Sequence, residues 1–359
     1  MKICIILGTR PEIIKMAPII RKLEKKKLDY FIIHTNQHYS NNMDKVFFEE
    51  LNLPKPKFNL QIGSGNHGEQ TGKMLIHIEN VLINEKPDII LVQGDTNTVV
   101  AGALSASKLG IKVGHVEAGL RSYDKGMPEE INRIVTDHIS DYLFCPTLIQ
   151  KEILVKEGIN REKIFVTGNT IADSIFENEK IAEEKSSILK RLDLQASKKY
   201  FVITAHRPSN VDNRDNLKKI FEILKIIKIR YNTEIIYPIH PRTFNNIKSF
   251  DIKIPEEIRL IEPLGYLDFL KLMSSADLIL TDSGGIQEEA CILGIPCLTL
   301  RDNTERPETI NAGSNILVGL DINKILAAIE SYNEKPKWNN PFGDGRSSER
   351  ILKIINNSK

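Results

Sequence analysis

Short apolar runs alternate with longer amphipathic segments along the whole chain. Several runs are apolar at consecutive positions, which is typical of strands that are covered on both faces of a parallel sheet. The runs that predict strands lie at residues 3–7, 30–34, 89–93, 113–116, 142–145, 164–166, 200–204, 234–238, 259–261, 278–281 and 296–300. Helical patterns separate them, and one repeats apolar residues at three- and four-residue steps: Leu217, Ile220, Phe221, Leu224 and Ile227. This alternation predicts an α/β fold with parallel sheets.

The alternation is interrupted over residues 170–199, which contain no strand pattern and are rich in charged side chains. We interpret this stretch as a polar connecting helix, because the strands of a second sheet follow it. A chain of 359 residues also agrees with about two domains. We therefore predict two Rossmann-like domains, residues 1–169 and 170–345. The helical pattern at 346–356 is expected to pack back on the first domain, so residues 346–359 are assigned to it.

Composition and charge describe an ordinary globular protein. Hydrophobic residues make up 41% and charged residues 27% of the chain, and the net charge is +2. This charge gives no reason to expect binding to nucleic acid or a membrane, and no apolar run reaches the roughly 18 residues of a transmembrane helix. The cysteines, Cys4, Cys145, Cys291 and Cys297, lack metal-site spacing. We expect them to be buried, reduced thiols of a cytoplasmic protein.

Ligands of open α/β sheets bind beyond the carboxyl ends of the strands, so polar residues at these ends are candidate site residues. The first strand is followed by Gly8-Thr9-Arg10-Pro11-Glu12, and Lys15 lies about one helical turn further on. Two cations, Arg10 and Lys15, at one strand end suit a diphosphate or a carboxylate. The alternative is that both are solvated surface charges.

Acidic residues follow two consecutive strands of the first half. Asp95 comes after strand 89–93, and Glu117 comes directly after strand 113–116. Consecutive parallel strands often pair at a spacing of about 4.8 Å, so both carboxylates are expected to be available for acid–base chemistry in one place. The alternative role for Asp95 is a helix cap. Glu129 lies in the first turn of a helix, where the helix dipole alone favours an acid.

The first strand of the second half ends in a histidine and an arginine. His206 and Arg207 follow strand 200–204, where they suit a phosphate or a leaving group. A single histidine at such a position also has a purely structural alternative. The pair is therefore a candidate site that needs support from neighbouring strand ends.

Two later strand ends supply that support. Strand 278–281 runs into Asp282-Ser283-Gly284-Gly285 and then a helix, so the small residues let backbone N–H groups approach a phosphate. Glu289, about one turn along this helix, is a candidate ligand of ribose hydroxyls. Arg306, after strand 296–300, is a further candidate for the diphosphate. The second half therefore predicts a nucleotide site.

The motifs of several other site classes are absent from the sequence. Residues 63–68 match GxGxxG, but Asp88, about 20 residues further on, begins a strand, whereas a dinucleotide site requires an acid at a strand end. No GKS/T phosphate loop, HExxH or GxSxG motif is present. We therefore expect no dinucleotide cofactor and no metal ion.

Together these motifs resemble those of the non-hydrolysing UDP-N-acetylglucosamine 2-epimerase family. In the first half the resemblance rests on Gly8-Thr9-Arg10-Pro11-Glu12 with Lys15, Gly94-Asp95-Thr96, residues 114–121, Pro128-Glu129-Glu130 with Asn132-Arg133, and residues 167–170. In the second half it rests on Ala205-His206-Arg207 and residues 281–290, 304–308 and 340–345. The motifs occur in order over nearly the whole chain, so the series is specific although each motif alone is weak.

The resemblance implies a GT-B-like fold, with two Rossmann-like domains facing a deep cleft, and a homodimer. It implies that the second domain binds UDP through Phe269, Ser283, Gly284, Gly285, Glu289 and Arg306. It implies that the sugar lies against Arg10, Lys15, Asp95, Glu117, Glu129 and His206. Gln37 and His38 match a Gln-His pair that bacterial members use to bind a second, activating UDP-GlcNAc.

The activity implied by the resemblance is the reversible conversion of UDP-GlcNAc into UDP-ManNAc, a precursor of cell-surface polysaccharides. Expulsion of UDP would build positive charge at C1 and make the C2 proton removable, which gives 2-acetamidoglucal. UDP would then re-add, and a proton would return to the other face of C2. The candidates for acid and base are Asp95, Glu117, Glu129 and His206, and their assignment stays open. The alternatives are a hydrolysing 2-epimerase and a GT-B glycosyltransferase.

Overall fold

The computed structural model describes residues 1–37, 47–194, 199–332 and 337–357. The chain divides into two compact units. Unit 1 comprises Met1–Glu177 and Phe342–Lys359, and unit 2 comprises Asn178–Pro341. The change of unit falls within helix α7 (Thr170–Lys185), whereas the sequence pattern places a boundary ahead of this helix. The change lies inside the stretch 170–199 that the sequence pattern interprets as a connecting helix.

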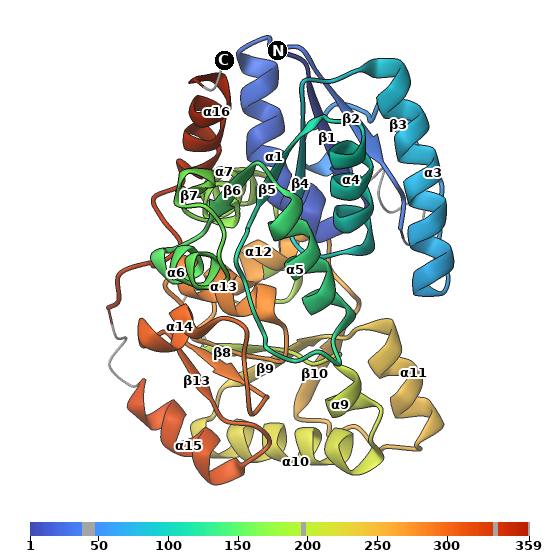
Figure 1. Ribbon diagram of the computed structural model, residues 1–359. Coiled ribbons are helices and arrows are strands. Elements are labelled where there is room, and N and C mark those ends of the chain that lie inside the picture. Colours follow the sequence, from blue (N-terminus) through green and yellow to red (C-terminus); the bar gives the residue numbers. More distant parts are fainter. Residues whose placement is uncertain (38–46, 195–198, 333–336, 358–359) are drawn as a thin grey trace. The chain divides into compact units, whose positions relative to one another are not determined.

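Unit 1 is built on a parallel sheet (Figure 1). Its strands are β1 (Ile3–Leu7), β2 (Tyr30–His34), β3 (Phe58–Asn59), β4 (Ile89–Gln93), β5 (Lys112–Val116), β6 (Tyr142–Cys145) and β7 (Ile164–Val166). They lie in the order β3-β2-β1-β4-β5-β6-β7. Helices of this unit include α1 (Arg10–Lys25), α3 (His67–Glu85), α4 (Asn97–Lys108), α5 (Pro128–Ile139), α6 (Leu148–Lys156), the start of α7, and α16 (Ser347–Asn357), with a 3-10 turn at Arg161–Lys163.

Unit 2 repeats the same plan with a second parallel sheet. Its strands are β8 (Tyr200–Thr204), β9 (Glu234–Pro238), β10 (Ile258–Ile261), β11 (Leu278–Thr281), β12 (Cys297–Thr299) and β13 (Asn315–Leu317), in the order β10-β9-β8-β11-β12-β13. The helices are α8 (Ile188–Arg191), α9 (Pro208–Val211), α10 (Arg214–Tyr231), α11 (Pro241–Ser249), α12 (Tyr266–Ser274), α13 (Gly284–Leu293), α14 (Pro307–Asn311) and α15 (Ile322–Ser331).

Both sheets have the strand order of a Rossmann fold, in which the direction of progression reverses once. The reversal lies between β1 and β4 in unit 1 and between β8 and β11 in unit 2. Ligands of such sheets bind beyond the carboxyl ends of the strands at this reversal. The topology therefore selects one candidate position in each unit, and both coincide with strand ends that carry predicted site residues.

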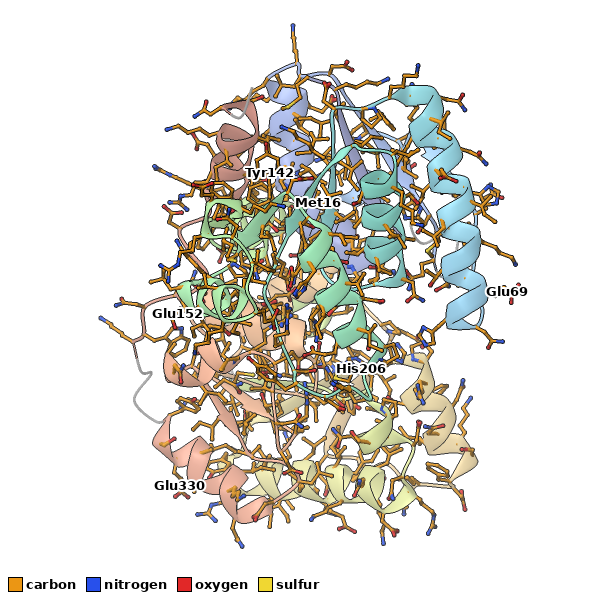
Figure 2. The ribbon with its side chains drawn as sticks, viewed as in Figure 1. Met16, Glu69, Tyr142, Glu152, His206 and Glu330 are labelled. Atoms are coloured by element: carbon orange, nitrogen blue, oxygen red, sulfur yellow. The ribbon has the colours of Figure 1, made fainter. Side chains whose placement is uncertain are left out.

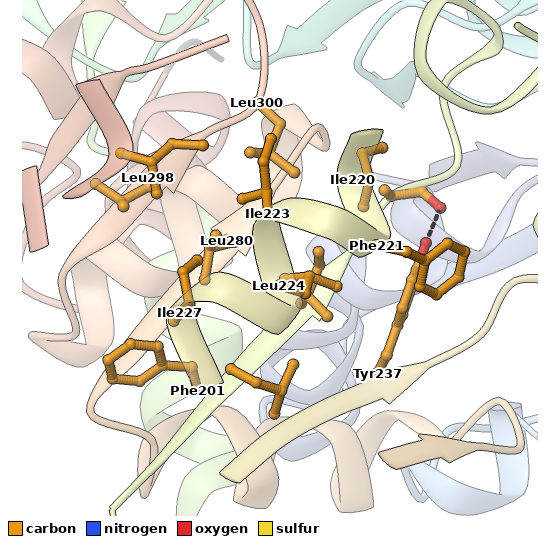
Figure 3. Packing of buried hydrophobic residues seen from close by; sticks show 14 of the residues in the cluster. Phe201, Ile220, Phe221, Ile223, Leu224, Ile227, Tyr237, Leu280, Leu298 and Leu300 are labelled. Atoms are coloured by element: carbon orange, nitrogen blue, oxygen red, sulfur yellow. Dashed lines mark hydrogen bonds between the residues drawn. The ribbon is translucent and has the colours of Figure 1, made fainter. Parts of the chain in front are cut away.

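The core of unit 2 shows how the predicted apolar stripe is used (Figure 3). The stripe residues of α10 are at most 2% exposed and share one core cluster with residues of the sheet, among them Phe201, Tyr237 and Leu280. Burial of one such side chain contributes about 1.5–3 kcal/mol. The Asn213 side chain caps the start of α10 by accepting from the N–H groups of Asp215 and Asn216. The amphipathic pattern and this cap together fix the helix.

Charged side chains on the outer helices are solvated. Glu69, Glu152 and Glu330 point outward from α3, α6 and α15, whereas Met16 of α1 is fully buried (Figure 2). Within the residues described, no helix is long and apolar enough to cross a membrane, and no cluster of side chains has the composition of a metal site. All four cysteines are buried and free of disulfides, and burial raises the pKa of the Cys291 thiol to about 11.

Eight of the eleven predicted strands have the predicted bounds, and the other three differ by one or two residues. Two short strands escaped prediction. Phe58–Asn59 has only two residues, and Asn315–Leu317 begins with a polar residue that is buried, so neither presents an apolar run. The predicted C-terminal helix corresponds to α16, which packs on α1 within unit 1.

Candidate functional site

The ends of β1, β4 and β5 bring together several of the residues predicted for the sugar side. Because these three strands are neighbours in the sheet, Arg10, Asp95 and Glu117 leave adjacent strand ends. Lys15 of α1 reaches Glu117, and its Nζ lies 2.5 Å from Glu117 Oε2. Both side chains are buried, with exposed fractions of 9% and 3%. The interpretation of Lys15 as a solvated surface charge is therefore wrong.

Glu117 is held in an unusual conformation. Its φ is +70°, in the left-handed region that non-glycine residues rarely adopt. Its carboxylate oxygen Oε2 also accepts from Nε2 of Gln93, the last residue of β4, at 2.5 Å. The buried contacts of its carboxylate accompany a backbone conformation that costs about 1–3 kcal/mol.

Asp95 is partly exposed and paired with a cation from α5. Arg133 donates to Asp95 Oδ2 through Nε at 3.0 Å and through Nη2 at 2.6 Å. Asn132 donates to the Asp95 carbonyl at 2.9 Å. The N-cap position of α4 belongs to Thr96, so the alternative role of Asp95 as the cap of this helix is wrong. Its carboxylate is instead oriented by Arg133.

The two adjacent acids at the start of α5 have different environments. Glu130 is buried and accepts from the N–H groups of Ser122 and Tyr123 and from Arg133. Burial raises the pKa of Glu130, but these donors outweigh it and hold the pKa below its usual value. Glu129 is partly exposed and, within the described residues, has no hydrogen-bond or ion-pair partner. Glu130 therefore ties down a loop, whereas Glu129 has a carboxylate available for a ligand.

Two further residues of unit 1 that were predicted as site residues, Arg10 and Gln37, lie in different surroundings. Arg10 is partly exposed, with its guanidinium 4.8 Å from the centre of the Phe47 ring. Gln37 follows β2, and its Oε1 accepts from the N–H and the hydroxyl of Thr98 at 3.3 and 2.9 Å. His38 lies outside the described residues. An activator role for Gln37 and His38 stays a prediction.

In unit 2, Asp282 organises the turn that carries His206. It is fully buried at the end of β11, next to β8 in the sheet. Asp282 accepts from the backbone N–H of His206 at 3.0 Å, from that of Arg207 at 2.9 Å and from the Asn210 side chain at 3.1 Å. The His206 side chain, labelled in Figure 2, stays 41% exposed. Asp282 is thus a buried support, and His206 is presented to solvent.

The small residues after β11 form the predicted helix start. Ser283 is the N-cap residue of α13, and its side chain makes no capping hydrogen bond. Gly284 and Gly285 open the helix, so backbone N–H groups without intrahelical partners lie at this end. Such an end favours a phosphate. Glu289, further along α13, is buried, and Phe269 of α12 is partly buried.

Arginines gather around one carboxylate near this helix start. Glu305 accepts from Arg207 Nη2 at 3.2 Å and from Arg301 Nη2 at 2.9 Å. Burial raises the pKa of Glu305, but Arg306, Arg301 and Arg207 outweigh it and lower the pKa to about 2. Arg306 also pairs with Glu288 of α13 at 2.8 Å. The predicted diphosphate ligand Arg306 therefore belongs to a network of cations.

Sequence reasoning assigned no role to the residues that support these side chains. Gln93, Arg133 and Glu12 are buried polar groups in contact with predicted site residues or their turns. The available signal was a polar side chain ending an apolar strand, for Gln93, or lying near a strand end, for Glu12. Which partner each one meets depends on the tertiary fold, and no local pattern encodes it.

Comparisons with known proteins show which family the chain is similar to. The family model described as UDP-N-acetylglucosamine 2-epimerase matches residues 21–356. A UDP-N-acetylglucosamine 2-epimerase of Methanocaldococcus jannaschii is 61% identical, and the match covers 100% of both chains. A UDP-2,3-diacetamido-2,3-dideoxy-D-glucuronate 2-epimerase of Pseudomonas aeruginosa is 41% identical, and the match covers 99% of each chain.

The fold also matches a crystal structure with a TM-score of 0.90, at 60% identity over 100% of both chains. That structure is the Methanocaldococcus jannaschii UDP-GlcNAc 2-epimerase in complex with UDP-GlcNAc and UDP. This chain belongs to the UDP-N-acetylglucosamine 2-epimerase family. The prediction of a GT-B-like fold built from two parallel-sheet units is confirmed.

Proposed function

We propose that this protein is a non-hydrolysing UDP-GlcNAc 2-epimerase that interconverts UDP-GlcNAc and UDP-ManNAc. The observation that carries the proposal is the buried Lys15–Glu117 pair at a strand end adjacent to that of Asp95. A chain 60% identical over its full length has been crystallised with UDP-GlcNAc and UDP, which supports the same substrate here. We also propose that the protein acts as a homodimer.

The chemistry explains why several acids are required. The C2–H bond of the sugar is not acidic, because C2 carries no carbonyl group. Cleavage of the bond between C1 and the UDP oxygen builds positive charge at C1, and a carboxylate then removes the C2 proton to give 2-acetamidoglucal. Return of UDP to C1, with delivery of a proton to the opposite face of C2, completes the inversion. Asp95, Glu117 and Glu129 are the proposed proton carriers.

The cations of unit 1 fit this scheme. Lys15 pairs with Glu117, and Arg133 pairs with Asp95, so each carboxylate at these neighbouring strand ends has a cationic partner. Arg10 is the proposed partner of the departing diphosphate on this side. Positive charge that is already in place costs no reorganisation when the leaving group gains its charge.

Unit 2 supplies the proposed UDP site. Ser283, Gly284 and Gly285 offer the N-terminal end of α13 to the diphosphate, and His206 and Arg207 stand at the neighbouring strand end. Glu289 is the proposed ligand of the ribose hydroxyls, with Phe269 beside the uracil and Arg306 as a further UDP ligand. No redox cofactor takes part in this scheme, because the oxidation state of C2 is the same at the start and the end.

Incubation of the purified protein with UDP-GlcNAc in deuterium oxide tests the proposal. We expect UDP-ManNAc and UDP-GlcNAc that both carry deuterium at C2, since solvent exchanges with the proton held by the enzyme. Free N-acetylmannosamine with UDP would identify a hydrolysing enzyme instead. Turnover only after addition of an acceptor would identify a glycosyltransferase.

The substrate needs its own comparison, because one relative acts on a different sugar nucleotide. The 41% identical Pseudomonas aeruginosa protein is named for UDP-2,3-diacetamido-2,3-dideoxy-D-glucuronate. That sugar differs from UDP-GlcNAc by a carboxylate at C6 and an acetamido group at C3. We expect kcat/KM to be higher for UDP-GlcNAc, and the reverse order would assign the other substrate.

A further inference from the structure

The side chain of His115 links the two strand ends that carry Asp95 and Glu117. His115 lies on β5 and is fully buried. Its Nε2 lies 2.8 Å from the Gly94 carbonyl oxygen, and its Nδ1 lies 2.7 Å from Asp137 Oδ1. Both ring nitrogens therefore face acceptor oxygens, so each of these hydrogen bonds requires an N–H on the ring.

This contact closes a second link between β5 and the end of β4. The N–H of Gly94 donates to the Val116 carbonyl at 3.1 Å, so β5 holds both the N–H and the carbonyl of one residue. Asp95 follows Gly94 directly, and Glu117 follows Val116 directly. The N–H belongs to the Gln93–Gly94 peptide group and the carbonyl belongs to the Gly94–Asp95 peptide group. The two bonds therefore hold both peptide planes that flank Gly94, and they fix the start of the Asp95 turn.

Asp137 of α5 holds the turn on both sides of Glu117. Its Oδ1 accepts from His115, two residues before Glu117, and its Oδ2 accepts from the Gly119 N–H, two residues after it, at 3.2 Å. This brace helps to explain how Glu117 keeps a φ of +70°. Asp137 therefore connects α5 directly to the end of β5, and to the end of β4 through the ring of His115.

On its other side, the Asp137 carboxylate belongs to a chain of alternating charges. Arg121 Nη1 donates to Asp137 Oδ2 at 2.7 Å, and the other side of the Arg121 guanidinium pairs with Glu157 at 2.6 and 2.8 Å. Burial raises the pKa of Asp137, but His115 and Arg121 outweigh it and keep the pKa below its usual value. An anionic Asp137 is the state that can accept from the ring of His115.

We propose that His115, held by Asp137, is a positioning residue that fixes the separation and orientation of Asp95 and Glu117 in the epimerase reaction. The inference rests on the proposed function, since it assigns those two carboxylates to proton transfer. His115 touches neither the sugar nor UDP in this scheme. It acts through the Gly94 peptide and through the turn that carries Glu117.

Two amide substitutions of His115 test the two contacts of its ring one at a time. In His115→Asn the Nδ2 group stands near the position of Nδ1 and keeps a donor for Asp137, but nothing reaches Gly94. In His115→Gln the Nε2 group stands near the position of the ring Nε2 and keeps a donor for Gly94. The matched control is His138→Asn, because His138 is an exposed histidine of α5. Melting temperature, UDP affinity, KM, kcat and C2 deuterium exchange are measured for all three variants.

We expect His115→Asn to lower kcat and the rate of C2 exchange by roughly 10- to 100-fold, as small misplacements of catalytic groups do, with UDP affinity unchanged. His115→Gln should recover much of this loss, and His138→Asn should match the wild type. A folded His115→Asn variant that exchanges C2–H at the wild-type rate would overturn the proposal. Equal losses of kcat in both amides, in step with their melting temperatures, would also overturn it, because they indicate a merely structural role.

A measurement on the wild-type protein covers the case in which the variants do not fold. In protein with ¹⁵N-labelled histidine, both ring nitrogens of His115 should carry protons that exchange slowly with solvent. An unprotonated Nε2 would remove the contact to Gly94 and overturn the proposal. This spectrum does not depend on turnover, so a wild-type protein inactive on UDP-GlcNAc would refute the proposed function separately.

Discussion

Two buried glutamates at the strand ends of unit 1 are stabilised in different ways. Glu117 contacts the cation of Lys15. Glu12 contacts neutral donors: the N–H groups of Gly8 and Thr9 reach its Oε2 at 2.7 Å, and the Thr96 hydroxyl reaches its Oε1 at 2.7 Å. Burial raises the pKa of Glu12 to about 7, and these hydrogen bonds offset only part of the effect.

The raised pKa of Glu12 makes stability depend on pH. The folded protein binds the proton of the Glu12 carboxyl more tightly than the unfolded chain, in which this carboxyl has the usual pKa of 4.5. The contribution of Glu12 to the free energy of unfolding is therefore fully present below pH 4.5 and is lost as the pH rises to about 7. A change of 2.5 pKa units corresponds to about 3 kcal/mol. Glu12→Gln resembles the protonated form, so its free energy of unfolding should rise relative to the wild type over this range.

Urea unfolding of the wild type and Glu12→Gln at several pH values measures this difference. Glu79→Gln is the control, because Glu79 is exposed on α3 and its change should leave the pH dependence as it is. Parallel pH profiles for wild type and Glu12→Gln would show that burial does not favour the protonated form of Glu12.

The candidate site residues could be proposed from the sequence because each follows an apolar run or opens a helix. Asp95, Glu117, His206 and Ser283 all leave strand ends at or beside the two reversal points. Their partners were not accessible. The contact of Lys15 with Glu117 joins residues 102 positions apart, so only the packed sheet determines it.

At the scale of elements, the start of α13 depends on close packing against Glu305. A Cβ atom on Gly284 would lie 2.3 Å from Glu305 Oε1, far inside contact distance. Glu305 has little freedom to move away, because it also accepts from Arg207 and Arg301. The next glycine is different: a Cβ on Gly285 would have Ser283 Oγ as its nearest neighbour, at 4.0 Å.

The two glycines therefore form a matched pair for mutation. Gly284→Ala should lower the free energy of unfolding by about 1–3 kcal/mol, the usual cost of overpacking. Gly285→Ala should leave it unchanged or raise it by about 0.4–1 kcal/mol, because alanine restricts the unfolded chain. Denaturant unfolding without ligand measures both. Equal effects would mean that Glu305 moves aside at no cost.

Most strands could be predicted from the sequence, but strands without an apolar run could not, and the reason is physical. A strand buried on both faces, such as β4, is an apolar run that ends abruptly at a turn. Strand β13 is held by partners instead: Asn315 accepts from Thr299 and donates to Gln287, so a polar residue occupies a buried position. Patterns of hydrophobicity do not reveal such a strand.

At the scale of the whole molecule, the chain enters unit 2 within α7 and returns to unit 1 for its last helix. The carboxylate of Asp173 in α7 contacts the start of α16, where it accepts hydrogen bonds from the N–H groups of Ser347 and Ser348 at 3.0 and 2.9 Å. An acidic side chain at a helix start also suits the helix dipole. Helix α16 then buries Ile351, Leu352 and Ile355. Unit 1 is therefore completed by residues far from the rest of it in sequence.

If α16 belongs to the cooperative structure of unit 1, a defect in it should loosen that unit as a whole. Leu352→Ala removes a fully buried side chain and should lower the free energy of unfolding of unit 1 by about 2–5 kcal/mol. Amide hydrogen exchange should then quicken in β1 and β4, which are distant in sequence from the mutation, and stay unchanged in β8 and β11 of unit 2. Lys353→Ala, at an exposed position of the same helix, is the control. Faster exchange confined to α16 would mean that the helix frays by itself, and an equal increase in both sheets would mean that the two units unfold as one.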